Sequence, residues 1–286
     1  MIVGLGGGTG SSRLWRALAG RVPPDEFTIV VNTADDFRRD GLRICPDLDT
    51  TLAALSGMDS GAALGLAGPR TERLRAGDGL AEITRGLAAA AGVRVSVLPM
   101  TEQEVSTRLN TFSEENLRYQ EFLDDRDAEP AVASVRYDGI DEARPAPGVL
   151  EAIGAAELVV LGPSNPLAGV LPILRIPGVA AALRDTHAEI VAVTPVVYGV
   201  PITDPAEHRR ARSRAALMHT VGLPAIAVSV AKLHRGVCDR FVLDRADAAE
   251  AGRIRALGLE VDLASTLIAR ADPGELVDTV LAGSRY

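Results

Sequence analysis

The sequence predicts an α/β protein of the Rossmann-like, doubly wound type, in which helices cover both faces of a mainly parallel sheet. Short apolar runs rich in β-branched residues alternate along the chain with amphipathic stretches, an order typical of successive βαβ units. The apolar runs are continuous, as expected for strands that are buried on both faces. With 286 residues, 47% of them hydrophobic, the chain can bury one large core, and we expect a single domain over residues 1–286.

The expected elements alternate along the whole chain. We expect strands of the main sheet at residues 2–5, 27–32, 93–98, 157–162, 190–194, 225–229, 241–244 and 259–262. We expect helices at residues 11–18, 46–55, 80–91, 148–154, 209–214 and 273–282. A small α/β insertion is expected around residues 100–145, with strands at 107–111 and 132–137 and a helix at 118–123. The weakly patterned, Gly- and Ala-rich residues 56–75 predict a mobile loop or short helices.

A glycine-rich turn, Gly-Gly-Gly-Thr-Gly at residues 6–10, follows the first expected strand and precedes a helix. Glycines leave no side chains in the way, so backbone N–H groups can converge on an anion at a helix N-terminus, where unpaired donors and the dipole favour negative charge. The turn is neither a GxGxxG nor a Walker motif, which disfavours a dinucleotide site or an ATPase loop. We expect phosphate to bind at Gly7, Gly8, Thr9 and Gly10. The alternative is a tight turn that binds nothing.

Acids and an amide follow the second expected strand and begin the next helix. Asn32 and Asp35 lie just past the end of that strand, at the edge where open α/β sheets bind their ligands. Asp47 and Asp49 lie in the first turn of the helix at 46–55. One interpretation is structural, since acidic side chains in the first turn of a helix interact favourably with its dipole. The functional interpretation, which the clustering favours, is that Asp47 and Asp49, with an acid that follows the strand, hold Mg²⁺ or orient a hydroxyl nucleophile against a bound phosphate.

Two further strand ends carry polar groups. Ser164 and Asn165 lie between two prolines after the strand at 157–162, and Thr194 ends the next strand. We expect them to line a nucleotide crevice at the same edge of the sheet, with a Ser or Asx turn as the alternative. The arginines at 209–214 form a charge run. Such a run is usually a solvated face, although one or two of these arginines could reach a substrate anion.

Composition limits the partners and the compartment. A net charge of −8 argues against a nucleic-acid backbone as the main ligand, so we expect no nucleic-acid partner. Cys45 and Cys238 are far apart and lack metal-ligand spacing, which indicates a reducing compartment and no structural zinc. The sequence shows no signal peptide and no apolar run of membrane-spanning length, and we expect a cytoplasmic protein with no membrane partner.

Several motifs occur in a fixed order. They are Gly-Gly-Thr-Gly at 7–10, Val-Asn-Thr-x-Asp-Asp at 31–36, Gly-Leu-Arg-Ile-x-Pro-Asp-Leu-Asp-Thr at 41–50, Leu-Pro-Met-Thr at 98–101, Gln-Glu at 120–121 and Gly-Pro-Ser-Asn-Pro at 162–166. With these motifs the chain resembles the CofD family, the 2-phospho-L-lactate transferases of deazaflavin coenzyme biosynthesis. The resemblance runs from the first strand nearly to the last helix, and it implies a homodimer.

The resemblance also implies a reaction. It is the Mg²⁺-dependent transfer of a phospholactyl or phosphoenolpyruvyl group from a guanosine diphosphate (GDP) donor to a ribityl hydroxyl of the deazaflavin Fo, with release of GMP. Such a transfer depends on positioning and charge neutralisation and needs no covalent nucleophile. By position, Gly8 to Gly10 would contact the donor phosphates, and Asp47 and Asp49 the metal or the acceptor hydroxyl. The residues expected to contact substrates in the crevice are Asn32, Asp35, Cys45, Ser164 and Asn165.

Two departures from the family pattern lie on the acceptor side. Family members usually have serine in place of Cys45. They also carry a segment with tryptophan and a Leu-Gly-Asp-x-Asp pattern, for which residues 58–75 are too short, so we expect an altered acceptor pocket. One alternative is a related enzyme that acts on a different hydroxyl acceptor. Another is a non-catalytic nucleotide or nucleotide-sugar sensor, because related gluconeogenesis factors share the glycine-rich opening. Residues 46–50 and 162–166 favour the transferase.

Overall fold

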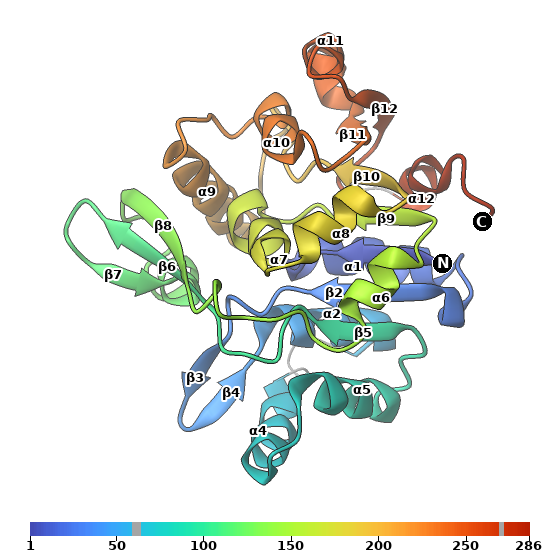
Figure 1. Ribbon diagram of the computed structural model, residues 1–286. Coiled ribbons are helices and arrows are strands. Elements are labelled where there is room, and N and C mark those ends of the chain that lie inside the picture. Colours follow the sequence, from blue (N-terminus) through green and yellow to red (C-terminus); the bar gives the residue numbers. More distant parts are fainter. Residues whose placement is uncertain (59–63, 269–271) are drawn as a thin grey trace.

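The computed structural model describes residues 1–58, 64–268 and 272–286. Its centre is a seven-stranded sheet of parallel strand pairs in the order β12-β11-β10-β9-β1-β2-β5 (Figure 1). The strands are β1 (Ile2–Leu5), β2 (Phe27–Val31), β5 (Ser96–Pro99), β9 (Leu158–Leu161), β10 (Glu189–Val193), β11 (Arg240–Asp244) and β12 (Glu260–Ala264). The predicted α/β fold with a parallel sheet is confirmed.

The strand order places β1 where the chain reverses direction across the sheet. β1 pairs with β2 on one side and with β9 on the other, so Gly4 lies between Ile29 and Val160. From β2 the chain continues outward to β5, and it then returns to β9 and proceeds through β10 and β11 to β12. Ligands of open α/β sheets bind at such a reversal, outside the carboxyl ends of the strands. A site is therefore expected beyond Leu5 and Leu161.

Helices cover both faces of the sheet, because side chains along each strand alternate between two buried apolar clusters. One face carries α1 (Gly8–Ala19), α2 (Pro46–Ser56), α5 (Leu80–Ala90) and α12 (Gly274–Leu281). The other carries α6 (Val149–Gly154), α7 (Leu171–Arg175), α8 (Val179–Asp185), α9 (Pro205–His219), α10 (Ala227–His234) and α11 (Ala251–Arg255). This two-sided arrangement is the doubly wound topology that the sequence predicts.

Two glycines let α1 pack closely on the sheet. A Cβ atom on Gly4 would lie 2.8 Å from the ring of Trp15, and one on Gly162 would lie 2.7 Å from it. Trp15 also packs edge-on against Phe27, with ring centroids 6.2 Å apart. Because these contacts hold α1 down, the glycine loop that precedes it is fixed beyond the ends of β1 and β9.

A small antiparallel sheet and a hairpin extend from the main sheet (Figure 1). β6 (Ser106–Thr111) pairs with β7 (Asn116–Arg118) and β8 (Val132–Asp138), within the range expected for the insertion. The hairpin of β3 (Phe37–Arg39) and β4 (Leu42–Ile44) does not appear among the sequence-based expectations. Both units lie beside the carboxyl end of β2, on the side of the predicted site.

Three expected elements differ in the structure. Residues 225–229 are not a strand, because α10 begins at Ala227 and is buried along most of its length, and β11 takes the place beside β10. A short apolar run is compatible with a buried helix or a strand, and only long-range packing decides between them. The strand expected at 93–98 begins at Ser96, since the turn after α5 takes up the preceding residues. The helix expected at 118–123 begins at Tyr119 and continues through the π-helical turn Glu121–Asp125, because Arg118 still belongs to β7.

The segment expected to be a loop or short helices contains a defined helix. α2 ends at Ser56, followed by Gly57 in the left-handed conformation with φ of 75°. Helix α4 spans Ala67–Ala76 and ends in the same way at Gly77. Residues 59–63 lie outside the described residues. The helical alternative for this segment is therefore correct over α4.

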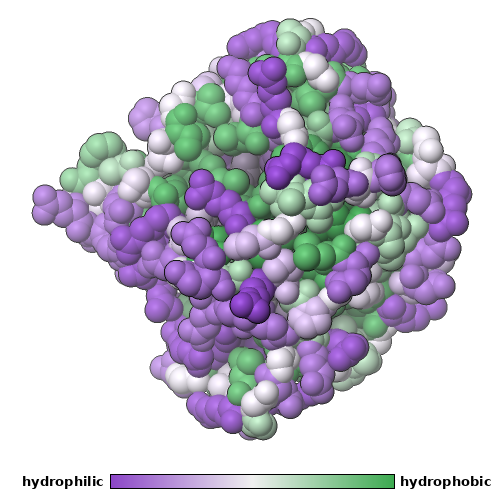
Figure 2. All heavy atoms as spheres, viewed as in Figure 1, coloured by the Kyte–Doolittle hydropathy of each residue, from purple (hydrophilic) through white to green (hydrophobic). Residues whose placement is uncertain are grey.

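The surface in view is mainly hydrophilic, with hydrophobic side chains visible between the polar ones near its centre (Figure 2). The large hydrophobic side chains that are exposed among the described residues are Leu42, Phe112, Leu150, Tyr198 and Val221. None of the helices in the described ranges could cross a membrane on its own. The bent pair Pro166–Arg175 and Val179–Asp185 passes the length and composition criteria only when its two parts are taken together.

Candidate functional site

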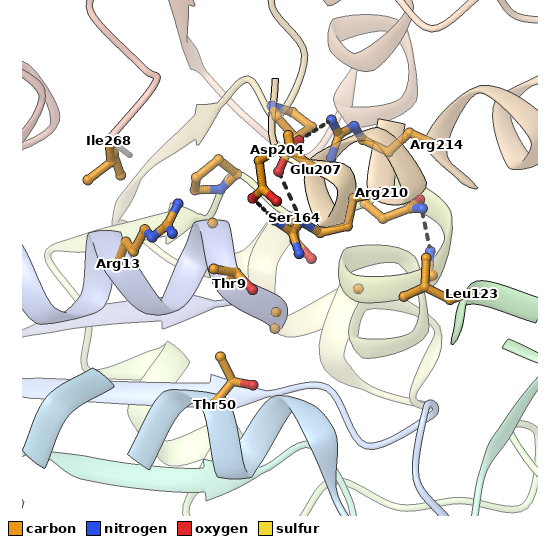
Figure 3. Close-up of a pocket in the computed structure, with 18 of the residues that line it drawn as sticks. Thr9, Arg13, Thr50, Leu123, Ser164, Asp204, Glu207, Arg210, Arg214 and Ile268 are labelled. Carbon is orange, nitrogen blue, oxygen red and sulfur yellow. Dashed lines mark hydrogen bonds and ion pairs between the residues drawn. The ribbon is translucent and has the colours of Figure 1, made fainter. Parts of the chain in front are cut away.

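A cavity of about 620 Å³ opens beyond the carboxyl ends of β1, β9 and β10. Its walls come from segments far apart in the sequence, among them the glycine loop, the start of α2, the insertion and α9 (Figure 3). The predicted site residues that line it are Gly7, Gly8, Thr9, Gly10, Asp35, Asp47, Ser164, Asn165 and Thr194. The predicted site residues that are not part of its lining are Asn32, Cys45 and Asp49.

The glycine loop is tightly fitted on two sides and open on one. A Cβ atom on Gly7 would overlap the carboxylate of Asp47, and one on Gly10 would overlap the backbone oxygen of Pro163. Gly8 has φ of 75°, a left-handed conformation that favours glycine, and faces more open space. Because α1 begins at Gly8, N–H groups of its first turn lie at the cavity wall, where those that are not paired with Asp47 can bind an anion.

Two buried carboxylates, Asp35 and Asp47, lie in the same cavity wall. The Nδ2 of Asn32 donates to Oδ2 of Asp47 over 2.9 Å, and the N–H of Gly8 donates to Asp47 as well. The Oδ1 atom of Asp35 is buried and has no hydrogen-bond partner in the described structure. Burial raises the pKa of Asp47 to about 6. Burial, and then the charge of Asp47, raise the pKa of Asp35 well above its ordinary range.

These two carboxylates fit a magnesium site that is completed by substrate. Mg²⁺ in enzymes is commonly held by one or two carboxylates together with substrate phosphates and water. Within the described residues, no group of three or more His, Cys, Asp or Glu side chains could hold a metal by itself. The unpartnered Oδ1 of Asp35 and the repulsion between Asp35 and Asp47 would both be relieved by a bound cation.

Asp49 has a different environment from Asp47. Both of its carboxylate oxygens accept from Arg70 of α4, which is itself buried, with Nη1 3.2 Å from Oδ2. Side chains two residues apart on a helix point roughly 200° away from each other, so Asp47 and Asp49 cannot face the same cavity. The structure therefore does not support the expected metal role of Asp49, and it gives this residue a buried ion pair instead.

Asn32 and Cys45 are buried and do not line the cavity. Asn32 is fully buried, and besides binding Asp47 its Oδ1 accepts the N–H of Ala34 over 3.1 Å. It therefore positions Asp47. The thiol of Cys45 is also buried and donates to Oδ2 of Asp36 over 2.9 Å. Direct substrate contact by Cys45, which the sequence predicts, is not supported because the thiol is directed at Asp36.

The polar strand ends after β9 and β10 reach the cavity, but their side chains also stabilise the local backbone. Oδ1 of Asn165 accepts the N–H groups of Leu167 and Ala168, over 3.1 and 3.3 Å. This is the Asx turn considered as the alternative. Oγ1 of Thr194 donates to the backbone oxygen of Val196 over 2.9 Å. These side chains thus shape the wall of the cavity.

Several charged and polar side chains of the wall do not appear among the sequence-based expectations. Arg13 lies in the second turn of α1, is exposed, and forms no ion pair with any residue that the structure describes. Arg13 follows Thr9 by four residues, and residues i and i+4 share a helix face, so the sequence could have placed Arg13 on the same side of the helix as Thr9. Tyr119 and Glu207 also line the cavity without having been expected there. Arg210 and Arg214 belong to the charge run at 209–214, of which one or two arginines were expected to reach a substrate anion, and both line the cavity.

Comparison with known proteins identifies the family. The family model described as 2-phospho-L-lactate transferase CofD matches residues 2–261. The chain belongs to the CofD family. It is 31% identical to a 2-phospho-L-lactate transferase of Methanosarcina mazei, with 96% of this chain and 97% of that protein covered. It is 30% identical to a phosphoenolpyruvate transferase of Streptomyces griseus, with 90% of each covered. As a member of the CofD family, the chain is a transferase.

Structural comparison gives the same fold. A crystal structure of a UPF0052 family protein from Bacillus halodurans superimposes with a TM-score of 0.67 over 98% of both chains, at 18% sequence identity. This similarity supports the fold and carries no information on substrate. The alignment with the M. mazei CofD protein spans 306 positions, more than the 286 residues of this chain. The relative therefore has residues for which this chain has no counterpart.

Proposed function

We propose that this CofD protein transfers a phospholactyl or phosphoenolpyruvyl group from a GDP-linked donor to a hydroxyl of the deazaflavin Fo, with Mg²⁺ as cofactor and GMP as product. The observation that carries the proposal is that the glycine loop and the Asp35–Asp47 pair share one cavity at the reversal point of the sheet. A cradle for phosphates beside a cation site is what transfer of a substituted phosphate group requires.

In this proposal each part of the wall has one task. The N–H groups at the start of α1 and the guanidinium of Arg13 bind the diphosphate, since both are donors at the same wall. Asp35 and Asp47 hold Mg²⁺, and Asn32 fixes the orientation of Asp47. Bound there, Mg²⁺ supplies positive charge that offsets the charge developing on the phosphate oxygens. The donor and the acceptor hydroxyl are held in line by the surrounding walls, and no covalent intermediate with the protein is needed.

The first test concerns the phosphate site and uses two arginines of the same helix. We expect Arg13→Gln to weaken GDP binding in the presence of Mg²⁺ about tenfold or more, because a charge-assisted hydrogen bond to phosphate is lost. Arg16→Gln is the matched control, since Arg16 is also exposed on α1 but lies outside the cavity lining. Isothermal titration calorimetry measures both. Equal losses in the two variants, or no GDP binding by the unaltered protein, would argue against the proposed donor site.

The second test concerns the acceptor. We expect weak binding of Fo, with Kd well above about 1 μM, even when GDP binds normally. The reason is that α4 directs its buried polar residues Arg70 and Thr71 inward, toward Asp49 and the backbone of Arg43, and carries no aromatic side chain that could stack on a ring. A fluorescence titration with Fo, GDP and Mg²⁺ measures this. Kd near 1 μM would show that Fo is bound tightly despite the short segment. If binding is weak, turnover at high Fo concentration would support Fo as the acceptor, and its absence would favour a different alcohol.

A further inference from the structure

The inner face of α9 carries a group of three charged residues at the cavity, Glu207, Arg210 and Arg214. Oε1 of Glu207 accepts from Nη2 of Arg214 over 2.8 Å, and its Oε2 accepts from Nε of Arg210 over 2.9 Å (Figure 3). One carboxylate thus holds two guanidinium groups, and the trio keeps one net positive charge. Burial alone would raise the pKa of Glu207, but Arg214 and Arg210 lower it, which keeps the carboxylate ionised.

The other arginines of the same helix have a different environment. Arg209 pairs with Asp127 over 3.7 Å and Arg212 with Glu129 over 3.3 Å, both in the insertion and outside the cavity lining. The charge run of α9 therefore divides into an outer pair that ties the helix to the insertion and an inner pair that faces the cavity. Arg214 is the more enclosed of the inner pair, with a side chain that is 14% exposed.

Arg210 and Arg214 have N–H donors that are not used by Glu207. A guanidinium carries five N–H donors, and the hydrogen bonds with Glu207 use one from each arginine. Asp204 neutralises Arg210 only in part, because it lies 3.7 Å away and is exposed. A pair of fixed guanidinium groups at the wall of an otherwise acidic protein is suited to a carboxylate ligand.

We propose that Arg210 and Arg214 bind the carboxylate of the group that is transferred. This proposal rests on the proposed function. The CofD relatives bear two names, 2-phospho-L-lactate transferase and phosphoenolpyruvate transferase. In both of those groups, the carbon that bears the phosphate ester also bears a carboxylate, and the groups differ in the saturation of the neighbouring carbon. Recognition of the carboxylate by α9 would therefore serve either group, while the glycine loop binds phosphate.

The test compares ligands with and without the carboxylate. Calorimetry measures the binding of phosphoenolpyruvate and of ethyl phosphate, which has a phosphate ester but no carboxylate, to the Mg²⁺-loaded full-length protein. We expect the unaltered protein to prefer phosphoenolpyruvate. Arg214→Gln and Arg210→Gln should each weaken phosphoenolpyruvate binding about tenfold or more and leave ethyl phosphate unchanged. Arg212→Gln, on the outer face of the same helix, should leave both unchanged.

Two outcomes would overturn the proposal. One is that the unaltered protein binds the two ligands equally well, and the other is that Arg212→Gln removes the preference as Arg214→Gln does. Arg214→Lys keeps the charge but loses the planar fork, and it should restore part of the preference if the variants are folded. GDP binding is titrated separately. Absence of GDP binding would contradict the proposed donor site. The comparison of phosphoenolpyruvate with ethyl phosphate would still test whether the two arginines bind a carboxylate.

Discussion

Replacing Asp47 by asparagine is expected to lower turnover at least about a hundredfold, because the charge that holds the cation at the reacting phosphate is removed. The substitution is nearly isosteric, and the amide oxygen can still accept from Asn32. We therefore expect GDP to bind without Mg²⁺ much as before, but to lose the increase in affinity that Mg²⁺ provides. Steady-state kinetics and calorimetry with and without Mg²⁺ measure both effects. Turnover within a few-fold of normal would exclude Asp47 as a metal ligand.

The same variant should not lose stability at neutral pH. The folded-state pKa of Asp47, about 6, lies above its ordinary value of 3.8, so the folded protein binds this proton more tightly than the unfolded chain does. Stability from this group is present at pH below about 4 and is lost as the pH rises to about 6, and the ionised group costs on the order of 2 to 3 kcal/mol at pH 7. The neutral amide of the variant avoids this cost, although the hydrogen bond from Gly8 is weakened by about 1 kcal/mol.

Thermal unfolding of the unaltered protein and of Asp47→Asn between pH 5 and pH 8, without Mg²⁺, checks the sign. The difference in Tm should favour the variant most at the high end and shrink as the pH falls through about 6. A variant that is less stable throughout this range would show that Asp47 is held by attractive contacts and is not destabilised by burial. Such a result would also weaken the argument that the Asp35–Asp47 pair binds a cation.

Asp49→Asn is expected to have the opposite profile. It should lower the free energy of unfolding by about 3 to 5 kcal/mol, because the buried guanidinium of Arg70 loses its countercharge. Burial raises the pKa of Asp49 in spite of Arg70, so removal of the buried carboxylate charge offsets part of this loss. The net loss comes from the buried guanidinium, whose Nη1 and Nη2 both donate to Asp49. Turnover per folded molecule, measured below the unfolding transition, should remain within a few-fold of normal.

The control for Asp49 is the double variant Asp49→Leu with Arg70→Met, which removes both charges and fills the space with apolar groups. Replacement of a complete buried pair is often neutral, so this variant should recover most of the stability lost by Asp49→Asn. Urea denaturation measures all of these free energies. If Asp49→Asn abolishes turnover without loss of stability, the ion pair would not be the role of Asp49, and the metal role expected from the sequence would be supported again.

The strands, the covering helices and the edge of the sheet that carries the site could be predicted from the amino-acid sequence, because they depend on the order of residues along the chain. Continuous apolar runs separated by amphipathic stretches predict parallel strands and covering helices, and the carboxyl ends of such strands necessarily share one edge. This is why the glycine loop and the acids after β2 can be assigned to one site from the sequence. Asp35 and Asp47 line the cavity together with residues 7–10 as expected.

Which of several similar side chains face that site depends on the folded protein. Asp47 and Asp49 look equivalent in the sequence. Arg70 of α4, however, reaches α2 and pairs with Asp49 alone. The arginines of α9 form one charge run, yet Arg209 and Arg212 pair with the insertion and the other two face the cavity. Most helices and strands follow from neighbours in the sequence, with residues 225–229 an exception that packing decided. The partner of a charged side chain is set by long-range packing, because a buried charge must be matched by whichever segment folds against it.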